Sequence, residues 1–535
     1  MNKALLLACV VFAFAVLLRL YPTLISGQPF STDGWSSIRN AELLTQNTPI
    51  SLSNNSLFDG YNNYWLAISL FGVVFAQVTA LAPVDAMAFG IPLASALAVP
   101  LFFVLVRRLT ENASVALIAS ALLATAYPFV MSSAGATKEA FAFPLSLLLI
   151  LIFIQKPGWK WSALFTAVSL ALLLSHHLTA ALTFVALIFL AIASFLSGKA
   201  RWGGSIKQAV GLLTIFLAVA VAYYGFFALE GLPLSVSESD LLAIGAYQVI
   251  GLSLALFFVG KAKLFSKKTL TISYVATVAL ACGFMLFLTR KALLPTAPTL
   301  PMHYALYMIP YLIVVPLLVF GFMGLRERRN LFLVPVFWLA AIGAFECYAV
   351  FGGSAAGLML AYRTLNFLVL PIFIITGLVL WRFYASRQRM GGGRFWAAGV
   401  VVVVLAAASL GSCTMYAAVS LQEQYLGYFW LYRAPEISGG QWIAAHAQNV
   451  TVAGDMKVSY LIKSYHDLPM DVYGGLKYLQ SNSAKPALLY VYPEMSTNGY
   501  VVYTGLTATL PENWTSQLQD LNHVYQNNMV NLYAK

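Results

Sequence analysis

The chain has 535 residues, of which 60% are hydrophobic and 9% are charged, and its mean hydropathy is +0.79. Soluble domains carry about 25% charged residues, so this composition excludes that class and predicts a polytopic α-helical membrane protein. The formal net charge is +12, but the basic residues are scattered through short loops between apolar runs. Such scattering is typical of the charges that orient membrane helices, and it argues against a nucleic-acid partner.

Thirteen apolar runs are predicted to span the membrane, because a bilayer core about 30 Å thick needs roughly 20 apolar residues. They are expected at residues 4–25, 84–106, 113–131, 140–155, 160–175, 178–196, 207–228, 240–259, 270–289, 304–325, 331–350, 364–381 and 396–416. A cytoplasmic N-terminus would place nineteen Lys and Arg residues, but only two acids, in the cytoplasmic loops. This asymmetry predicts an integral protein of the cell (plasma) membrane with its C-terminus outside the cytoplasm.

The first external loop contains one further apolar stretch, residues 64–81. Counting it as a span would move every later cluster of Lys and Arg to the outer side. We therefore expect an interfacial or re-entrant helix, within a loop-helix region at about 36–82, whose aromatic residues favour the membrane boundary.

The chain becomes polar at about residue 421, which predicts a membrane domain over 1–420 and a small extracytoplasmic α/β domain over 421–535. Segments rich in β-branched and aromatic residues predict strands at 449–455, 487–492 and 500–504. The segment GGQWIAAHA predicts a helix. A region of roughly 115 residues is large enough to fold, but it has only a small hydrophobic core.

The sequence STDGWSSIRNAELL (31–44) follows the first apolar run directly, so Asp33 is expected at the water-facing mouth of the helix bundle. A carboxylate there can bind a metal ion or accept a proton, and Asp33 is the first candidate catalytic residue. The structural alternative is that Asp33 caps the helix that follows it.

Charges at membrane level are costly and are often functional. The second external loop carries Lys138 and Glu139, and Glu139 is the second candidate catalytic acid. The next external turn carries His176 and His177. The alternatives are that Lys138 and Glu139 form a snorkelling pair at the start of a helix, and that the histidines are polar residues of a helical hairpin.

Three more cations are expected outside, against the positive-inside trend. They are Arg290 and Lys291, after the ninth run, and Arg363, at the outer end of the twelfth. Together with Lys138 they are candidates for binding a donor phosphate, since arginine and lysine suit that group. Arg363 could instead anchor its helix at the membrane interface.

Oxygen and imidazole groups suit a divalent cation such as Mg²⁺ or Mn²⁺. Four of the candidates could supply such ligands, namely Asp33, Glu139, His176 and His177. A site that combines them with the cations would suit a phosphorylated lipid substrate.

These features together resemble the GT-C glycosyltransferase superfamily, whose members use polyprenyl-phosphate sugar donors. The resemblance rests on a first span that ends in RLYP (19–22), followed by the external segment DGWSSIR (33–39). An interfacial helix precedes the second span, and Glu139 and His176 follow in the next external loops. The terminal segment VYQNNMVNLY (524–533) is similar to the strand pair that closes many archaeal members.

Within the superfamily, the DGWSSIR segment looks like the first-loop motif of oligosaccharyltransferases, in which Asp33 would be a metal ligand. Three features depart from that subfamily. The WWDYG signature is absent, and SYHDLPMDVYGG (464–475) replaces it poorly. Lys138 and Glu139 stand where an acidic pair is expected, and the loop after the ninth run has no glutamate. The resemblance therefore favours a relative that transfers monosaccharides.

The resemblance implies inverting transfer of a sugar from a polyprenyl (dolichyl)-phosphate donor to a glycan, lipid or protein acceptor on the extracytoplasmic face. Asp33 would act as the base or hold a metal ion, and Arg363, helped by Arg290 or Lys291, would stabilise the leaving phosphate. Two other classes stay open, a lipid-linked saccharide transporter or flippase and a non-catalytic envelope scaffold. Substitution of Asp33 would separate them, because a scaffold would tolerate it.

Overall fold

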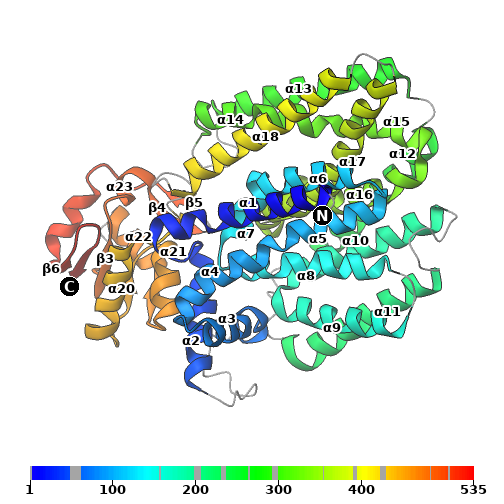
Figure 1. Cartoon of the computed structure of the whole chain (residues 1–535). Coiled ribbons are helices and arrows are strands. Elements are labelled where there is room, and N and C mark those ends of the chain that lie inside the picture. The colour runs from blue at the N-terminus through cyan, green and yellow to red at the C-terminus, as the bar shows by residue number, and fades with distance from the viewer. Residues whose placement is uncertain are drawn as a thin grey trace.

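The computed structural model describes residues 3–47, 62–155, 158–197, 206–229, 237–262, 265–291, 299–352, 355–389, 394–421, 429–481, 484–503 and 506–535. Figure 1 shows a long bundle of helices with a smaller region of strands and short helices at one end. The boundary between the two parts at about residue 421 stays a prediction. Residues 48–61 of the predicted loop-helix region lie outside the described residues.

All thirteen predicted runs are helical. The apolar helices are α1 (Lys3–Ser26), α4 (Pro83–Ala96), α5 (Ala98–Thr110), α6 (Ala113–Thr125), α7 (Tyr127–Ala134), α8 (Lys138–Phe153), α9 (Trp159–Ser175), α10 (His177–Leu196), α11 (Ile206–Tyr223) with the π-helix η3 (Tyr224–Ala228), α12 (Glu238–Lys261), α13 (Lys267–Leu288), α14 (Met302–Val314), the 3₁₀-helix η6 (Val315–Phe320), α15 (Gly321–Glu327), α16 (Arg329–Phe351), α17 (Ala355–Arg389) and α18 (Arg394–Leu421).

Within the described residues, ten helical segments are long and apolar enough to cross a membrane, and α6 with α7 makes an eleventh if this bent pair is one span. The other two predicted spans are α8 and α9, with 16 and 17 residues. They are about 24–26 Å long at 1.5 Å per residue, close to the thickness of a bilayer core. The chain is thus an integral membrane protein, and thirteen spans stays a prediction.

The first external loop contains two described helices, α2 (Trp35–Gln46) and α3 (Ala67–Thr79). The apolar helix α3 has 13 residues and is therefore only about 20 Å long. Such a helix is too short to cross the bilayer, in agreement with the prediction that this stretch is not a span.

Helix α16 lies at the centre of the bundle, in contact with α10, α12 and α17. Trp338 and Phe337 on α16, Leu187 on α10 and Phe373 on α17 are buried in one continuous apolar core. Between membrane helices such contacts stabilise through close packing, because lipid is as apolar as the core.

The C-terminal region forms a five-stranded mixed sheet in the order β2-β1-β3-β7-β6. Its elements are α20 (Ala434–His446), β1 (Val452–Ala453), α21 (Met456–Ser459), the π-helix η7 (Tyr460–Tyr465), β2 (Met470–Asp471), α22 (Val472–Ser481), β3 (Leu488–Val491), α23 (Met495–Asn498), β4 (Tyr500–Tyr503), β5 (Leu506–Ala508), the 3₁₀-helix η8 (Trp514–Asp520), β6 (Asn522–Gln526) and β7 (Asn531–Ala534). Strands β1, β2 and β3 are parallel, whereas β7 runs antiparallel to β3 and β6. The predicted strands, the helix in GGQWIAAHA and the terminal strand pair are all confirmed.

Candidate functional site

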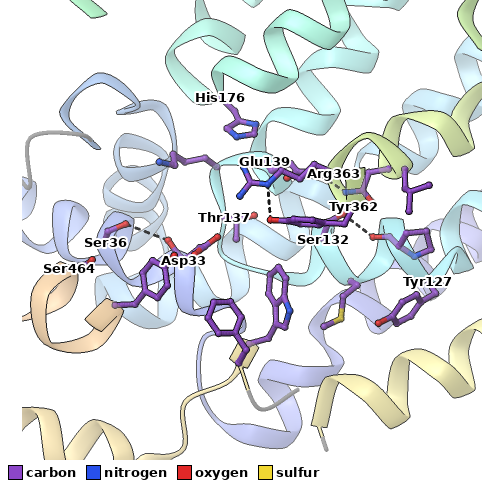
Figure 2. A pocket seen from close by; sticks show the side chains of 18 of the residues that line it. Asp33, Ser36, Tyr127, Ser132, Thr137, Glu139, His176, Tyr362, Arg363 and Ser464 are labelled. Carbon is purple, nitrogen blue, oxygen red and sulfur yellow. Dashed lines mark hydrogen bonds between the residues drawn. The ribbon is translucent and has the colours of Figure 1, made fainter. Parts of the chain in front are cut away.

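A cavity of about 490 Å³ lies where the helix bundle meets the C-terminal region. Figure 2 shows Asp33, Ser36 and Ser464 on one side of it and Tyr127 on the opposite side, with Glu139 and Arg363 between. The lining residues are Asp33, Ser36, Asn62, Tyr127, Pro128, Met131, Ser132, Thr137, Lys138, Glu139, His176, Tyr362, Arg363, Leu365, Asn366, Phe429, Trp430, Tyr460 and Ser464.

The backbone that leads to Asp33 is fixed from two sides. The Ser31 N–H donates to the Trp430 carbonyl at 2.8 Å, and the Phe30 carbonyl accepts from the Ala136 N–H at 3.0 Å. Ser31 has a φ of +82°, which is uncommon for a residue other than glycine and persists only where the surroundings hold it. Asp33 therefore projects from a well-determined segment of backbone.

Gly34 is required by close backbone packing. A Cβ atom at this position would lie 2.6 Å from the carbonyl oxygen of Ala136, on the segment that leads into α8. On the same segment, a Cβ at Gly135 would lie 2.8 Å from the Cβ of Ser31. The two segments that carry Asp33 and Glu139 thus pack directly against each other.

Asp33 does not cap α2, so that structural alternative is wrong. Helix α2 has Gly34 as its N-cap and no side-chain cap. The hydroxyl of Ser36 donates to the backbone carbonyl of Asp33 at 3.4 Å, and not to the carboxylate. The carboxylate side chain lines the cavity instead.

The other large residues of the DGWSSIR segment connect α2 to the C-terminal region. The Trp35 ring lies 5.6 Å from the Tyr432 ring in an edge-to-face arrangement. Ile38 is fully buried in the same apolar cluster. Arg39 forms an ion pair with Asp467 at 2.8 Å. The motif therefore combines two cavity residues, Asp33 and Ser36, with three docking residues.

Lys138 and Glu139 occupy the first turn of α8, where the Thr137 hydroxyl caps the helix. The ammonium of Lys138 donates to the amide oxygen of Asn62 at 2.6 Å. The amide of Asn366, on α17, donates to the Glu139 carboxylate at 2.9 Å. The helix N-terminus also favours a carboxylate at Glu139. Both side chains are thus held by partners from other segments and face the cavity.

Arg363 lies near the start of α17 and lines the cavity. Its Nε donates to the Tyr362 hydroxyl at 2.8 Å, and its guanidinium lies 5.4 Å from the centre of that ring. These contacts restrict the guanidinium, whose planar fork suits bidentate contacts with a phosphate.

The two histidines have different environments. His176 is 4% exposed, lines the cavity and shares a hydrogen bond of 2.8 Å between its Nδ1 and the Thr179 hydroxyl. His177 is not among the lining residues, and its ring packs 4.9 Å from that of Trp65. Only His176 is therefore placed to contact a ligand in this cavity.

Arg290 and Lys291 are not brought to the cavity. Both are exposed residues just beyond the C-terminal end of α13, and neither is a lining residue. Of the four cations predicted to bind the donor phosphate, Arg363 and Lys138 share one cavity, and Arg290 and Lys291 do not join them.

The predicted metal site of four side chains is not assembled. Among the described residues, no three His, Cys, Asp or Glu side chains lie close enough together to hold a metal ion. Lys138 and Arg363 line the same cavity as Asp33 and Glu139. A divalent ion in this cavity stays a prediction.

Most polar lining residues escaped the sequence analysis, among them Tyr362, Asn366, Tyr460 and Ser464. Tyr460 and Ser464 are four residues apart, a spacing that puts two side chains on one face of a helix. This spacing is the feature of the sequence from which the two residues could have been predicted to share a face. The negative charge of Asp33, and then burial, raise the pKa of the Tyr460 phenol, which therefore stays protonated and lies close to Asp33.

No protein-family model matches the chain, and no curated protein matches it by sequence. Solved structures do match. An oligosaccharyltransferase from Archaeoglobus fulgidus in its apo form matches with a TM-score of 0.59 over 93% of this chain and 70% of its own, at 12% identity. The chain has the GT-C fold. ArnT from Cupriavidus metallidurans bound to undecaprenyl phosphate matches with a TM-score of 0.51 over 98% of this chain and 97% of its own, at 13% identity.

The A. fulgidus enzyme has also been solved tethered to an acceptor peptide that contains an NVT sequon, and this form matches with a TM-score of 0.57 over 92% of the chain and 70% of its own, at 12% identity. At such low identities the likeness shows the fold alone. The GT-C fold predicted from the sequence is confirmed, and the activity must be argued from the cavity.

Proposed function

We propose that this protein transfers a sugar from a polyprenyl-phosphate donor to an acceptor on the extracytoplasmic face, with inversion at the sugar carbon. The observation that carries the proposal is one cavity that holds a carboxylate, two cations and an apolar wall. Asp33 lines one side, Lys138 and Arg363 lie in its polar part, and Tyr127 and Leu365 belong to the wall. The undecaprenyl phosphate bound by the ArnT structure supports a lipid phosphate as the donor's carrier.

In this reaction Asp33 accepts the proton of the acceptor hydroxyl as its oxygen attacks the anomeric carbon. The bond from that carbon to the phosphate oxygen breaks, and the lipid phosphate leaves with its negative charge. The guanidinium of Arg363 and the ammonium of Lys138 stabilise that charge as it develops.

Glu139 has a supporting role. Asn366 holds its carboxylate, and the charge of Glu139 acts on Arg363. A carboxylate beside the guanidinium keeps the arginine in place when the cavity is empty, which limits the cost of an unpaired buried cation. The phosphate of the donor would then bind to the remaining faces of the guanidinium.

The test compares purified wild-type protein with Asp33→Asn, using radiolabelled hexose on dolichyl phosphate and on undecaprenyl phosphate and a membrane extract as acceptor. Removal of a positioned base costs roughly 10²–10⁴-fold in rate. The matched control is Asp85→Asn, because Asp85 is an exposed acid in the first turn of α4 that does not line the cavity. Full activity of Asp33→Asn would reject the assignment.

Transfer of an oligosaccharide to protein is the second candidate. It is favoured by the likeness to the A. fulgidus oligosaccharyltransferase with its tethered acceptor peptide. A synthetic NVT peptide, offered with a radiolabelled lipid-linked oligosaccharide as donor, distinguishes the two, since only an enzyme of that type would label it.

A further inference from the structure

The C-terminal region contributes a π-helix, η7 (Tyr460–Tyr465), to the wall of the cavity. Tyr460 and Ser464 both project into it from this segment. π-helices are rare and occur frequently at functional sites, because the extra residue redirects the side chains. The proposed transfer reaction uses no residue of η7. It therefore does not explain why Tyr460 and Ser464 line the cavity.

The start of this helix is anchored in the core of the C-terminal region. Asp455 is fully buried and caps α21 by accepting from the Val458 N–H at 2.9 Å. The same carboxylate accepts from the Val501 N–H at 3.3 Å and from the Tyr492 hydroxyl. Helix α21 runs directly into η7, so η7 is fixed to Val501 on β4 and to Tyr492, which follows β3.

The other end of η7 is bound to α2, the helix that follows Asp33. The Trp35 ring lies 4.9 Å from the Tyr465 ring in an edge-to-face arrangement. The Tyr465 hydroxyl donates to the Glu42 carboxylate at 3.1 Å, and Arg39 pairs with Asp467 at 2.8 Å. The two segments thus form one docked unit, and a side chain on η7 has a defined position relative to the cavity.

Within this unit the Tyr460 phenol lies against the Asp33 carboxylate. The short helix that carries Asp33, η1 (Thr32–Gly34), contacts η7 directly. Asp33 and Tyr460 line the same cavity, and the charge of Asp33 raises the pKa of the Tyr460 phenol. The Phe429 ring, at 6.1 Å and nearly perpendicular, packs against Tyr460. A protonated phenol in this place is a hydrogen-bond donor to the carboxylate.

We propose that Tyr460 is a positioning residue of the transfer site, whose hydroxyl donates a hydrogen bond to Asp33 and holds the carboxylate toward the acceptor. The C-terminal region is then a component of the active site and not only a cover over it. This inference rests on the proposed function of Asp33 as the base. Its physical reason is that the backbone at Asp33 is fixed, whereas the carboxylate still needs a partner to select one side-chain rotamer.

Asp33 interacts with charged and titratable groups from three elements: Tyr460 on η7, Glu139 on α8, and Tyr362 and Arg363 on α17. Lys138 lines the same cavity. Replacement of Tyr460 by phenylalanine leaves the other groups in place and removes only the hydroxyl that faces Asp33.

The first experiment measures kcat and the donor KM for Tyr460→Phe, with Tyr473→Phe as the matched control. Tyr473 is 66% exposed on α22 and does not line the cavity. A hydrogen bond to a charged group is large enough to change kcat roughly tenfold. We expect that loss of kcat in Tyr460→Phe, with an unchanged donor KM. An unchanged kcat, or a rise in KM alone, would overturn the inference.

The second experiment does not depend on catalysis. The melting temperatures of Asp33→Ala, Tyr460→Phe and the double variant form a double-mutant cycle, which is additive for residues that do not interact. We expect the double variant to lose no more than the larger of the two single losses. Strict additivity would overturn the pairing. If the wild-type protein transfers no sugar from lipid donors, the proposed function fails, but this cycle still decides whether Tyr460 binds Asp33.

Discussion

Residue by residue, the DGWSSIR segment shows why a short motif can carry both chemistry and structure. Asp33 faces the cavity, Gly34 packs against a carbonyl, and Arg39 pairs with the C-terminal region. A substitution can thus affect the reaction by removing the acid itself or by moving the backbone that carries it. Movement of the backbone should also lower the stability of the protein.

We expect Gly34→Ala to reduce transfer although it leaves every cavity side chain in place. The new Cβ would meet the Ala136 carbonyl at 2.6 Å, so the backbone that carries Asp33 must move. Overpacking of this kind costs roughly 1–3 kcal/mol, which thermal unfolding would detect. The control is Gly399→Ala on α18, where nothing lies within 4 Å of the added atom. Equal activity of the two variants would show that the close packing at Gly34 has no influence on the site.

At the scale of the elements, the contact between α2 and the segment 460–467 joins the helix bundle to the C-terminal region beside the cavity. His466 belongs to this contact, and its Nε2 is buried with no hydrogen-bond partner among the described residues. Burial, and then the charge of Arg39, lower the pKa of His466 from 6.5 to about 4. The folded protein therefore keeps this imidazole neutral at a pH where the unfolded chain protonates it.

The contribution of His466 to stability should consequently fall as the pH drops from about 6.5 to about 4, and this contribution should change no further below that range. The unfolded state binds more protons than the folded state in this window, so the free energy of unfolding rises with pH there. We expect His466→Gln to weaken this dependence by an amount on the order of 1–3 kcal/mol. Melting temperatures of both proteins across the window measure it, and parallel curves would contradict the expectation.

At the scale of the whole molecule, the helical fold was predictable from the sequence. The apolar runs are long, and clusters of charged residues mark the loops between them. Strands β1, β3 and β4 were predictable from their β-branched and aromatic residues, whereas β2 (Met470–Asp471) and β5 (Leu506–Ala508) were not predicted. The bend of 61° between α6 and α7 was not predicted either. It occurs where Pro128 lies in the first turn of α7, and the Ser412 hydroxyl on α18 accepts from the Tyr127 N–H that the helix leaves free.

The site was predictable only in part. Asp33, Lys138, Glu139, His176 and Arg363 were chosen for their charge or polarity at membrane level, and the cavity brings them together. The same criterion also selected His177, which packs on Trp65, and the pair Arg290 and Lys291, which lies elsewhere. Position along a loop does not determine the direction of a side chain. The contribution of η7 depends on contacts between segments about 430 residues apart, which charge patterns do not reveal.

The orientation in the membrane is still a prediction from the distribution of charges, and cysteine labelling tests it. In a background without the native cysteines, an impermeant maleimide should label Asn528→Cys in intact cells. Lys267→Cys, at the first residue of α13, should react only after permeabilisation. Both positions are exposed in the structure. The reverse pattern would invert the topology and place the cavity on the cytoplasmic side.

The central claim is that the cavity binds the phosphate of a polyprenyl lipid through Arg363, and one affinity measurement tests it most directly. The dissociation constant for undecaprenyl phosphate is compared in nanodiscs for the wild type, Arg363→Lys, Arg363→Ala and the control Arg290→Ala/Lys291→Ala. We expect Arg363→Ala to bind roughly tenfold more weakly or worse, Arg363→Lys to lie between, and the control to match the wild type. If Arg363→Lys and Arg363→Ala both bind like the wild type, Arg363 is an interface anchor and the phosphate site lies elsewhere.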